Sequence, residues 1–271
     1  MLNARDILGV TITDESEDKI SEYVFDAIKS GKKKLFITTP NPEILVYANH
    51  HLDYKDKLNR ADVSLPDGIG LVVASAFLGK SVKTRIAGVD FMEKLCKDSE
   101  KNPVSMGFLG GKHGVAEKTA LCLQKKYPWI KVGFIGEEWG VANLSDPQLG
   151  GEQKRASPPA REARQGRTDD DVSPHFTPAP IDILFVAYGA PKQEEWISEN
   201  LERLPIKAAM GVGGAFDYLS GRVPRAPKIL RMVGLEWLFR LIIQPWRIWR
   251  QLSLIAFIYL VCKEFLKKRT A

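Results

Sequence analysis

Residues 181–197, IDILFVAYGAPKQEEWI, begin as an apolar run, reach a glycine and pass directly into a helical pattern. Apolar strands that end in glycine recur along the chain at VSMGFLGG (104–111), IKVGFIG (130–136) and IKAAMGVGG (206–214). Two further apolar runs that predict strands are LFITT (35–39) and ADVSL (61–65). Near-continuous apolar strands that alternate with helices are typical of a parallel sheet covered on both faces. The sequence therefore predicts an α/β fold, a mostly parallel sheet with helices on both faces.

Local signals near the N-terminus predict where elements begin and end. ILGVTI (7–12) is a β-branched run that predicts one short strand. Asp14 and Glu17 have the spacing of a capping box, so we expect a helix from there to Gly31, which suits a helix C-cap. Pro42 suits the first turn of the next helix.

The strand ends predict the position of a ligand site. In open parallel sheets, ligands bind in the crevice at the carboxyl ends of the strands. Polar residues and glycines should therefore gather at one edge of the sheet. Those that the topology places there are Thr39, Asn41, Asp67, Gly110, Gly111, Gln193, Gly213, Gly214 and Asp217.

Asp67 is the candidate general base. It lies between Pro66 and Gly68 at a strand end, where a carboxylate can project into the cleft from a fixed backbone. An ordinary Pro-Asp-Gly turn is the alternative interpretation. Arg85, which follows the next helix, is a candidate to offset the charge of a diphosphate, and a solvated surface arginine is the alternative there.

Glycine-rich strand ends are candidate phosphate sites. FLGGKHG (108–114) and GVGGAFD (211–217) allow backbone amides and helix N-termini to approach a phosphate closely. The first is a weak dinucleotide signal because it reads GGxxG instead of GxGxxG. Tight strand–helix turns explain both runs equally well. Lys192 and Gln193 open a helix after a strand, where they either hydrogen-bond a sugar or phosphate or serve only as helix-terminal residues.

Composition and cysteine spacing favour a cytoplasmic globular protein. The 271 residues are 44% hydrophobic and 27% charged, which is ordinary for a globular protein, and the length suits one large domain or a domain plus an appendage. Cys96, Cys122 and Cys262 are far apart, which argues for a reducing compartment and against a disulfide framework or a zinc site. The first residues show no basic segment followed by an apolar run, so we expect no signal peptide.

Metal and cofactor motifs are not found in the sequence. TDDD (168–171) imitates a metal-binding DxD, but it lies in the proline- and glycine-rich segment 143–180, which predicts a flexible, atypical insert. His50 and His51 have no partner at metal-ligand spacing. We therefore expect neither a metal nor a cofactor. A nucleotide-cofactor oxidoreductase is the alternative enzyme class for such a sheet.

Residues 222–271 predict a basic, amphipathic appendage to a domain of residues 1–221. They hold 11 Lys and Arg against two acidic residues, in a chain of net charge +6. Tryptophans that alternate with arginines suit the headgroup region of a membrane, and the longest uncharged run, 251–262, is too short to cross a bilayer. Pro245 should divide the tail into two helices. The alternatives are a helix pair packed on the body, a homo-oligomer contact or a nucleic-acid-binding module, although tryptophans among Leu and Ile favour lipid.

The strand-end sequences together resemble a known family. The stretches TTPNPEILVYAN, LPDGIGLVVASAFLGKSVKTRIAGVDF, GFLGGKHG, FVAYGAPKQEEWI and GVGGAFDYLSGRVPRAPKILRMVGLEWLFRLIIQPWR closely resemble the WecG/TagA/CpsF glycosyltransferases (glycosyltransferase family 26). The resemblance covers residues 5–142 and 181–250. The sequence departs from the family pattern at 143–180, where the family usually has a short helical segment.

The resemblance implies a Rossmann-like catalytic domain, a C-terminal helical appendage that docks on the membrane, and an inverting, metal-independent transfer. TagA-type members transfer N-acetylmannosamine from UDP to undecaprenyl-diphosphate-linked N-acetylglucosamine in the teichoic acid linkage unit. WecG-type members transfer the corresponding uronic acid, which stays open as an alternative. The implied partners are a UDP-sugar donor, a polyprenyl-diphosphate acceptor and the inner face of the cell membrane, and nucleic acid is not among them.

The resemblance also implies a role for each matching residue. Asp67 becomes the base, and Thr39 and Asn41 line the sugar pocket. Asp217 lies near the nucleoside. The other implied substrate ligands are Arg85 and Gln193, and the arginines implied to bind the lipid diphosphate are Arg222, Arg225 and Arg231.

Overall fold

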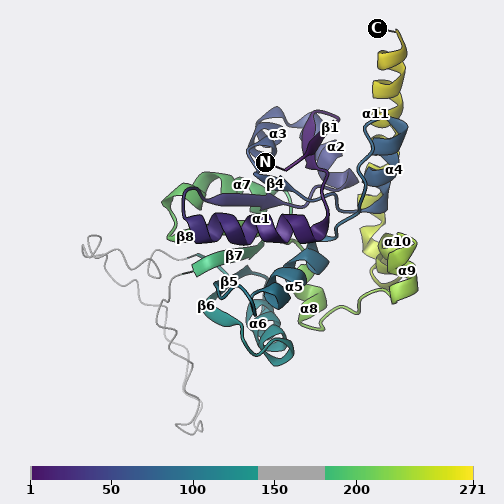
Figure 1. Cartoon of the computed structure of the whole chain (residues 1–271). Coiled ribbons are helices and arrows are strands. Elements are labelled where there is room, and N and C mark those ends of the chain that lie inside the picture. Colours follow the sequence, from purple (N-terminus) through teal and green to yellow (C-terminus); the bar gives the residue numbers. More distant parts are fainter. Residues whose placement is uncertain (1, 140–180, 271) are drawn as a thin grey trace, which may run out of the picture.

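A computed structural model describes residues 2–139 and 181–270 of the chain (Figure 1). The insert predicted at 143–180 lies outside the described residues, and so does its TDDD run. The predicted α/β architecture is confirmed by a six-stranded sheet in which every pair of neighbouring strands is parallel. The strand order is β4-β3-β8-β7-β5-β6. The strands are β3 (Leu35–Thr38), β4 (Val63–Ser64), β5 (Ser105–Gly110), β6 (Lys131–Gly136), β7 (Ile181–Ala187) and β8 (Ile206–Gly211).

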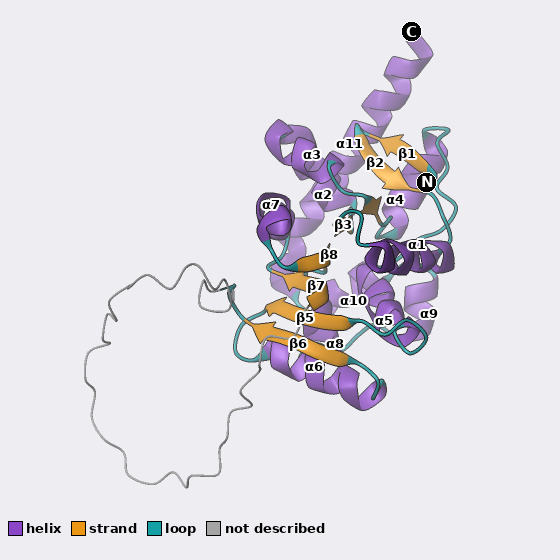
Figure 2. Ribbon diagram, turned by 60° about the vertical axis from the view of Figure 1, so that its left-hand side comes forward, coloured by secondary structure: helices purple, strands orange, loops and turns teal. Residues whose placement is uncertain are grey.

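Helices cover both faces of this sheet (Figure 2). Successive residues of a strand point to opposite faces, so Phe185 packs in one core cluster and Leu184 in the other. The helices of the first face are α1 (Glu17–Ser30), α5 (Gly88–Asp98), α6 (Val115–Lys126) and α8 (Ala215–Leu219). The elements of the second face are α7 (Lys192–Asn200) and the 3₁₀ turn η2 (Leu201–Arg203).

The N-terminal run predicted as one strand at 7–12 is two strands, which corrects that prediction. β1 (Ala4–Ile7) and β2 (Val10–Thr13) form an antiparallel hairpin. Leu8 and Gly9 make the two-residue turn with φ of 55° and 78°. Positive φ at both central residues is the geometry that matches the twist of a tight hairpin.

The helix that follows begins two residues later than the capping-box prediction. Ser16 is the N-cap, and its side chain accepts a hydrogen bond from the Lys19 backbone N–H. Asp14 is buried instead, where its carboxylate accepts from the Lys83 backbone N–H at 2.9 Å and pairs with Arg5. The predicted C-cap at Gly31 is confirmed, with φ of 60°.

The C-terminal tail folds against the N-terminal part of the chain. Phe257 and Val261 are buried in a third core cluster with the hairpin. The other helices of that cluster are α2 (Pro42–His50), α3 (Leu52–Asn59) and α4 (Ile69–Phe77). The tail elements are α9 (Lys228–Met232), α10 (Glu236–Ile243), the 3₁₀ turn η3 (Pro245–Arg247) and α11 (Ile248–Thr270).

The tail divides at Pro245, as the sequence predicts. Helix α11 packs on α2 and α4, and its last turns extend past the body in Figures 1 and 2. Within the described ranges, no helix combines the length and the apolar character that a bilayer crossing needs. A domain boundary at residue 221 stays a prediction.

Candidate active site

A cavity of about 630 Å³ opens at the carboxyl ends of β3 and β4, between the body and the tail. Its walls come from the N-terminus of α2, one side of α4, and helices α10 and α11. The polar residues on its wall are Asn41, Glu43, Asp67, Arg85, Tyr218, Glu236, Arg240 and Ser253. The wall is apolar farther along α4 and α11.

The Asp67 corner holds the candidate base at the start of this cavity. The Asp67 backbone N–H donates to the Pro40 carbonyl at 2.9 Å, which ties the corner to the end of β3. Gly68 follows with φ of 94°, a conformation that favours glycine, and α4 starts at the next residue. The Asp67 carboxylate accepts a hydrogen bond from the Gly88 backbone N–H at the start of α5. Its side chain is therefore held in place while the residue stays partly exposed.

The surroundings raise the pKa of Asp67 to about 6. Burial is the main cause, because it disfavours the charged carboxylate. The positive charge of Arg85 acts in the opposite direction, and the negative charge of Glu236 raises the pKa further. A carboxylate with a pKa close to neutral, facing a cavity, has the properties of a general base.

Arg85 links the Asp67 corner to the tail. Its Nη1 donates to the Arg231 carbonyl at 2.8 Å, and its Nη2 pairs with Glu236 at 2.9 Å. Its Nε is buried, and nothing in the described part of the chain accepts a hydrogen bond from it. Arg85 thus retains an unsatisfied donor at the cavity wall.

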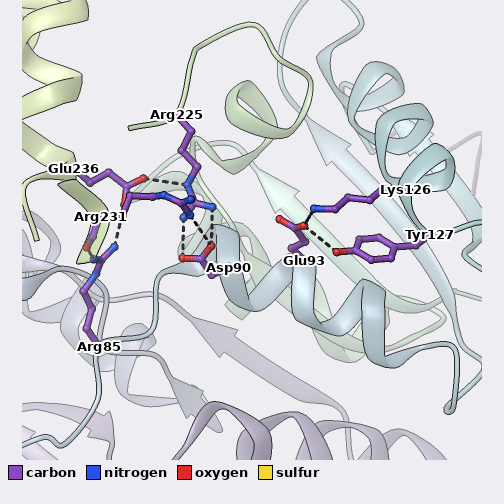
Figure 3. Close-up of polar contacts among 8 residues, drawn as sticks. All are labelled: Arg85, Asp90, Glu93, Lys126, Tyr127, Arg225, Arg231 and Glu236. Carbon is purple, nitrogen blue, oxygen red and sulfur yellow. Dashed lines mark hydrogen bonds and ion pairs between the residues drawn. The ribbon is translucent and has the colours of Figure 1, made fainter. Parts of the chain in front are cut away.

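A charged network joins the tail to the N-terminal end of α5 (Figure 3). Arg225 binds both carboxylate oxygens of Asp90, at 2.6 and 2.8 Å, and contacts Glu236 at 3.2 Å. Arg231 lies 3.7 Å from Asp90. Together with Arg85, three arginines therefore share two carboxylates. The bidentate pair of Arg225 with Asp90 fixes the relative orientation of the two side chains as well as pairing their charges.

The predicted lipid-diphosphate ligands do not line the cavity. Arg225 and Arg231 are engaged in the network, whereas Arg222 is half exposed and lies 4.0 Å from Asp217. Their binding of a diphosphate stays a prediction.

The two predicted sugar-pocket residues lie at the end of β3 but differ in exposure. Thr39 is buried, and its hydroxyl donates to the Gly211 carbonyl at 3.3 Å, which joins the ends of β3 and β8. Asn41 lines the cavity. Its carboxamide oxygen accepts from the Ile44 backbone N–H at 2.9 Å and caps α2.

Gln193 is buried between β7 and β8 and away from the cavity. Its Oε1 accepts hydrogen bonds from the backbone N–H groups of Gly189 at 3.2 Å and Gly213 at 2.8 Å. Its Nε2 donates to Glu194 at 2.7 Å. The carboxamide therefore joins two strand ends internally, and a direct contact with substrate stays a prediction.

Glu194, in the first turn of α7, is a second carboxyl with a raised pKa, and sequence reasoning missed it. It is fully buried and accepts a hydrogen bond from the Tyr54 hydroxyl at 3.1 Å. Burial raises the pKa of Glu194 to about 7. No spacing signal marked this pair, because Tyr54 lies 140 residues away along the chain. Glu236 was also missed, although it is one of only two acids in the basic tail.

The remaining predicted glycines and Asp217 lie at the ends of β5 and β8. Gly110 and Gly111 adopt φ of 100° and 74°. A Cβ on Gly214 would lie 2.8 Å from the Arg240 guanidinium, which also stacks over the Tyr218 ring at 4.9 Å. The structure thus brings three predicted residues together on the cavity wall, namely Asn41, Asp67 and Arg85.

Within residues 2–139 and 181–270, no group of three or more His, Cys, Asp or Glu side chains is arranged to hold a metal ion. The expected absence of a metal stays a prediction, and the TDDD run lies outside those ranges.

Comparison with known proteins gives a consistent set of relatives. The sequence model of the family described as "Glycosyl transferase WecG/TagA/CpsF family" matches residues 5–271. An N-acetylglucosaminyldiphosphoundecaprenol N-acetyl-beta-D-mannosaminyltransferase of Staphylococcus aureus strain MRSA252 is 33% identical, over 98% of this chain and 95% of the relative. Proteins of the same name from S. aureus strains NCTC 8325 and MW2 are 32% and 31% identical, with the same coverage.

Proposed function

The chain belongs to the WecG/TagA/CpsF family of glycosyltransferases, and from that premise we propose that it transfers N-acetylmannosamine from UDP to undecaprenyl-diphosphate-linked N-acetylglucosamine. The names of the relatives support this donor sugar and this acceptor. The observation that carries the proposal is Asp67, a carboxyl with a pKa of about 6 on the wall of a cavity that also holds Arg85. The alternatives of an oxidoreductase and a non-catalytic binding module do not fit membership of this family.

The proposed reaction is a direct displacement. Asp67 takes the proton of an acceptor hydroxyl while that oxygen attacks the anomeric carbon of the donor sugar. The bond between the anomeric carbon and the UDP oxygen breaks on the opposite face, so the configuration inverts and UDP leaves. General-base assistance of this kind typically contributes about 10²–10⁴-fold in rate.

The leaving diphosphate requires positive charge or hydrogen-bond donors. Arg85 has a buried Nε without an acceptor in the residues described, and Arg240 lies on the same cavity wall. Preorganised donors of this kind stabilise charge that develops in the transition state. We propose that they act without a divalent metal. Full activity in the presence of a chelator is expected, and activity that returns only when a divalent ion is added would contradict this part of the proposal.

The acceptor is a membrane lipid, and the tail offers an apolar surface for docking on a membrane. Large apolar side chains are exposed along α9, α10 and the turn η3, including Met232, Ile242 and Trp246. Tryptophan and arginine on such a surface suit the headgroup region of a bilayer. This surface supports a peripheral position on the inner face of the cell membrane.

A donor screen tests the proposed function. The purified full chain is given an acceptor with a short lipid, a diphosphate and N-acetylglucosamine, together with UDP-N-acetylmannosamine, its uronic acid or UDP-N-acetylglucosamine. We expect the mass of one added N-acetylmannosamine with the first donor alone. A uronic acid adduct would assign the chain to the other donor, and absence of product with all three would reject the proposal.

A further inference from the structure

The cavity continues beyond Asp67 as an apolar groove between two helices. Helix α4 contributes Val73 and Phe77 to its wall, and α11 contributes Leu254, Ile258 and Cys262. Within each helix these residues are four or eight positions apart, so each set forms a stripe along one side of its helix. At 1.5 Å of rise per residue, the stripe on α11 extends about 12 Å and the stripe on α4 about 6 Å.

The groove has a closed floor and an open mouth. Phe257 and Val261 are buried and form its floor. Val73, Phe77 and Ile258 on its sides are 60%, 50% and 61% exposed. Exposing large apolar side chains in one continuous hollow is unfavourable, and such a patch marks a binding surface.

The groove has a defined direction relative to the catalytic corner. Asp67 and Gly68 immediately precede α4, so the polar end of the cavity lies at the start of that helix. The far end is marked by Phe77, whose ring lies 4.4 Å from that of Phe265 on α11. A ligand in the cavity therefore meets the carboxylate first and apolar side chains afterwards.

We propose that this groove binds the first isoprenyl units of the acceptor, the part of the polyprenyl chain next to the diphosphate. This inference rests on the proposed function. The acceptor has the polarity that the cavity has, since a sugar and a diphosphate are followed directly by a branched hydrocarbon chain. A bulk membrane lipid or a second copy of the chain matches the apolar stripes but has no reason to reach Asp67. Helix α11 thus acts as one wall of the acceptor site.

Cys262 provides a direct readout of occupancy. It is exposed and lines the groove, while exposed Cys122 on α6 serves as a reference thiol in the same molecule and Cys96 is buried. The rate of maleimide alkylation at each thiol is measured by mass spectrometry with farnesyl diphosphate as the probe. At a probe concentration about ten times its Kd, we expect Cys262 to react about tenfold more slowly. Cys122 should react at an unchanged rate.

Three results would overturn the inference. One is unchanged alkylation of Cys262 at saturating farnesyl diphosphate. Another is equal protection by inorganic diphosphate alone, which would place the ligand at the polar end only. The third is equal protection by phosphatidylglycerol vesicles without any prenyl diphosphate, which would assign the groove to bulk lipid.

A control on the same helix separates binding in the groove from adsorption to the tail. Tyr259 is 64% exposed and does not line the cavity. In a Cys262→Ser background, the thiol of Tyr259→Cys should be alkylated at the same rate with and without farnesyl diphosphate. Equal protection at both positions would mean that the probe coats the apolar face, and would contradict the proposal.

Transfer kinetics give a second, independent readout. Ile258→Asp places a charge in the groove, and Ile255→Asp places the same charge on an exposed part of α11 outside the cavity. We expect Ile258→Asp alone to remove the advantage in kcat/KM of a long prenyl acceptor over an acceptor with a minimal alkyl chain. The KM for the UDP-sugar should stay the same. Loss of that advantage in both variants, or in neither, would reject the groove.

The two readouts distinguish failure of the groove from failure of the proposed function. If the wild-type chain transfers no sugar while Cys262 is still protected, the function fails and the prenyl site stands. If sugar is transferred to lipid acceptors while Cys262 is unprotected, the groove proposal alone fails.

Discussion

Two carboxyl groups with raised pKa values follow two strands of the same sheet, and their surroundings differ. Asp67 stands at the end of β4 with its pKa raised to about 6, and Glu194 follows β7 with its pKa raised to about 7. Asp67 reaches a cavity and has Arg85 nearby, whereas Glu194 is fully buried by Tyr54 and Gln193. A perturbed pKa alone therefore does not identify a base. Access to a cavity does.

Activity gives the largest expected difference between the two carboxyls. Asp67→Asn removes the proton acceptor at nearly unchanged shape, so we expect kcat to fall by about 10²–10⁴-fold. Glu194→Gln should leave kcat within about twofold, because Glu194 has no path to substrate. Steady-state transfer assays measure both, and calorimetry with UDP checks that the donor site is intact. Comparable losses of kcat in both variants would contradict the distinction between Asp67 and Glu194.

Stability of the network beside Asp67 gives the next effect. Arg225→Ala removes two hydrogen bonds to Asp90 and a contact with Glu236. The free energy of unfolding should fall by about 1.5–3 kcal/mol, since these bonds are charged and half-buried. Arg222→Ala, whose contact with Asp217 is 4.0 Å, should cost less than about 0.5 kcal/mol. Urea denaturation compares the two, and equal costs would contradict the distinction between network and surface arginines.

The same comparison predicts opposite stability changes at the two corners. The pKa of Asp67 is higher in the folded protein than in the unfolded chain, so its ionised form costs stability above pH 6. Above pH 6, the free energy of unfolding of Asp67→Asn should therefore exceed that of the wild type by about 1–2 kcal/mol. This difference should vanish below about pH 4. Tyr54→Phe should lose about 1 kcal/mol, because a carboxyl oxygen of Glu194 loses its donor. Thermal melts over this pH range show whether each substitution raises or lowers the stability of the protein.

The pH profile of catalysis gives the smallest effect. Below pH 6 Asp67 is mostly neutral and cannot accept a proton, so kcat/KM should rise with pH and level off above that value. Glu236→Gln removes a negative charge that raises the pKa of Asp67, so the midpoint should move to lower pH by less than about one unit. An unmoved midpoint in this variant would show that Glu236 does not act on Asp67.

The sequence predicts the sheet well because its strands are apolar runs buried on both faces. The sequence does not give the strand order, so residues that were predicted to share one cleft lie at separate places along the edge of the sheet. Asp67 and Gly110 end strands separated by four steps in the order β4-β3-β8-β7-β5, which is about 19 Å at 4.8 Å per step. The hairpin was missed because Leu8, a branched residue, takes a positive φ that its type rarely adopts.

Tertiary contacts explain the other differences at the site. Gln193 has the polar character of a ligand, but two backbone N–H groups of neighbouring strand ends occupy its oxygen. Arg225 and Arg231 have the charge to bind a diphosphate, and in the structure they lie on the carboxylate of Asp90. The sequence gives no sign of these pairings, because Gly213 lies 20 residues from Gln193 and Asp90 lies 135 residues from Arg225.

The shared core of the β1–β2 hairpin and helix α11 has a consequence for synthesis on the ribosome. The hairpin leaves the exit tunnel long before Phe257 and Val261, which complete its core. Until they arrive, Ile7, Val10 and Ile12 lack part of their packing, so the nascent chain exposes an incomplete apolar surface until α11 has emerged. Closure of this core and assembly of the cavity wall on α11 thus coincide, and a chain halted before α11 lacks both.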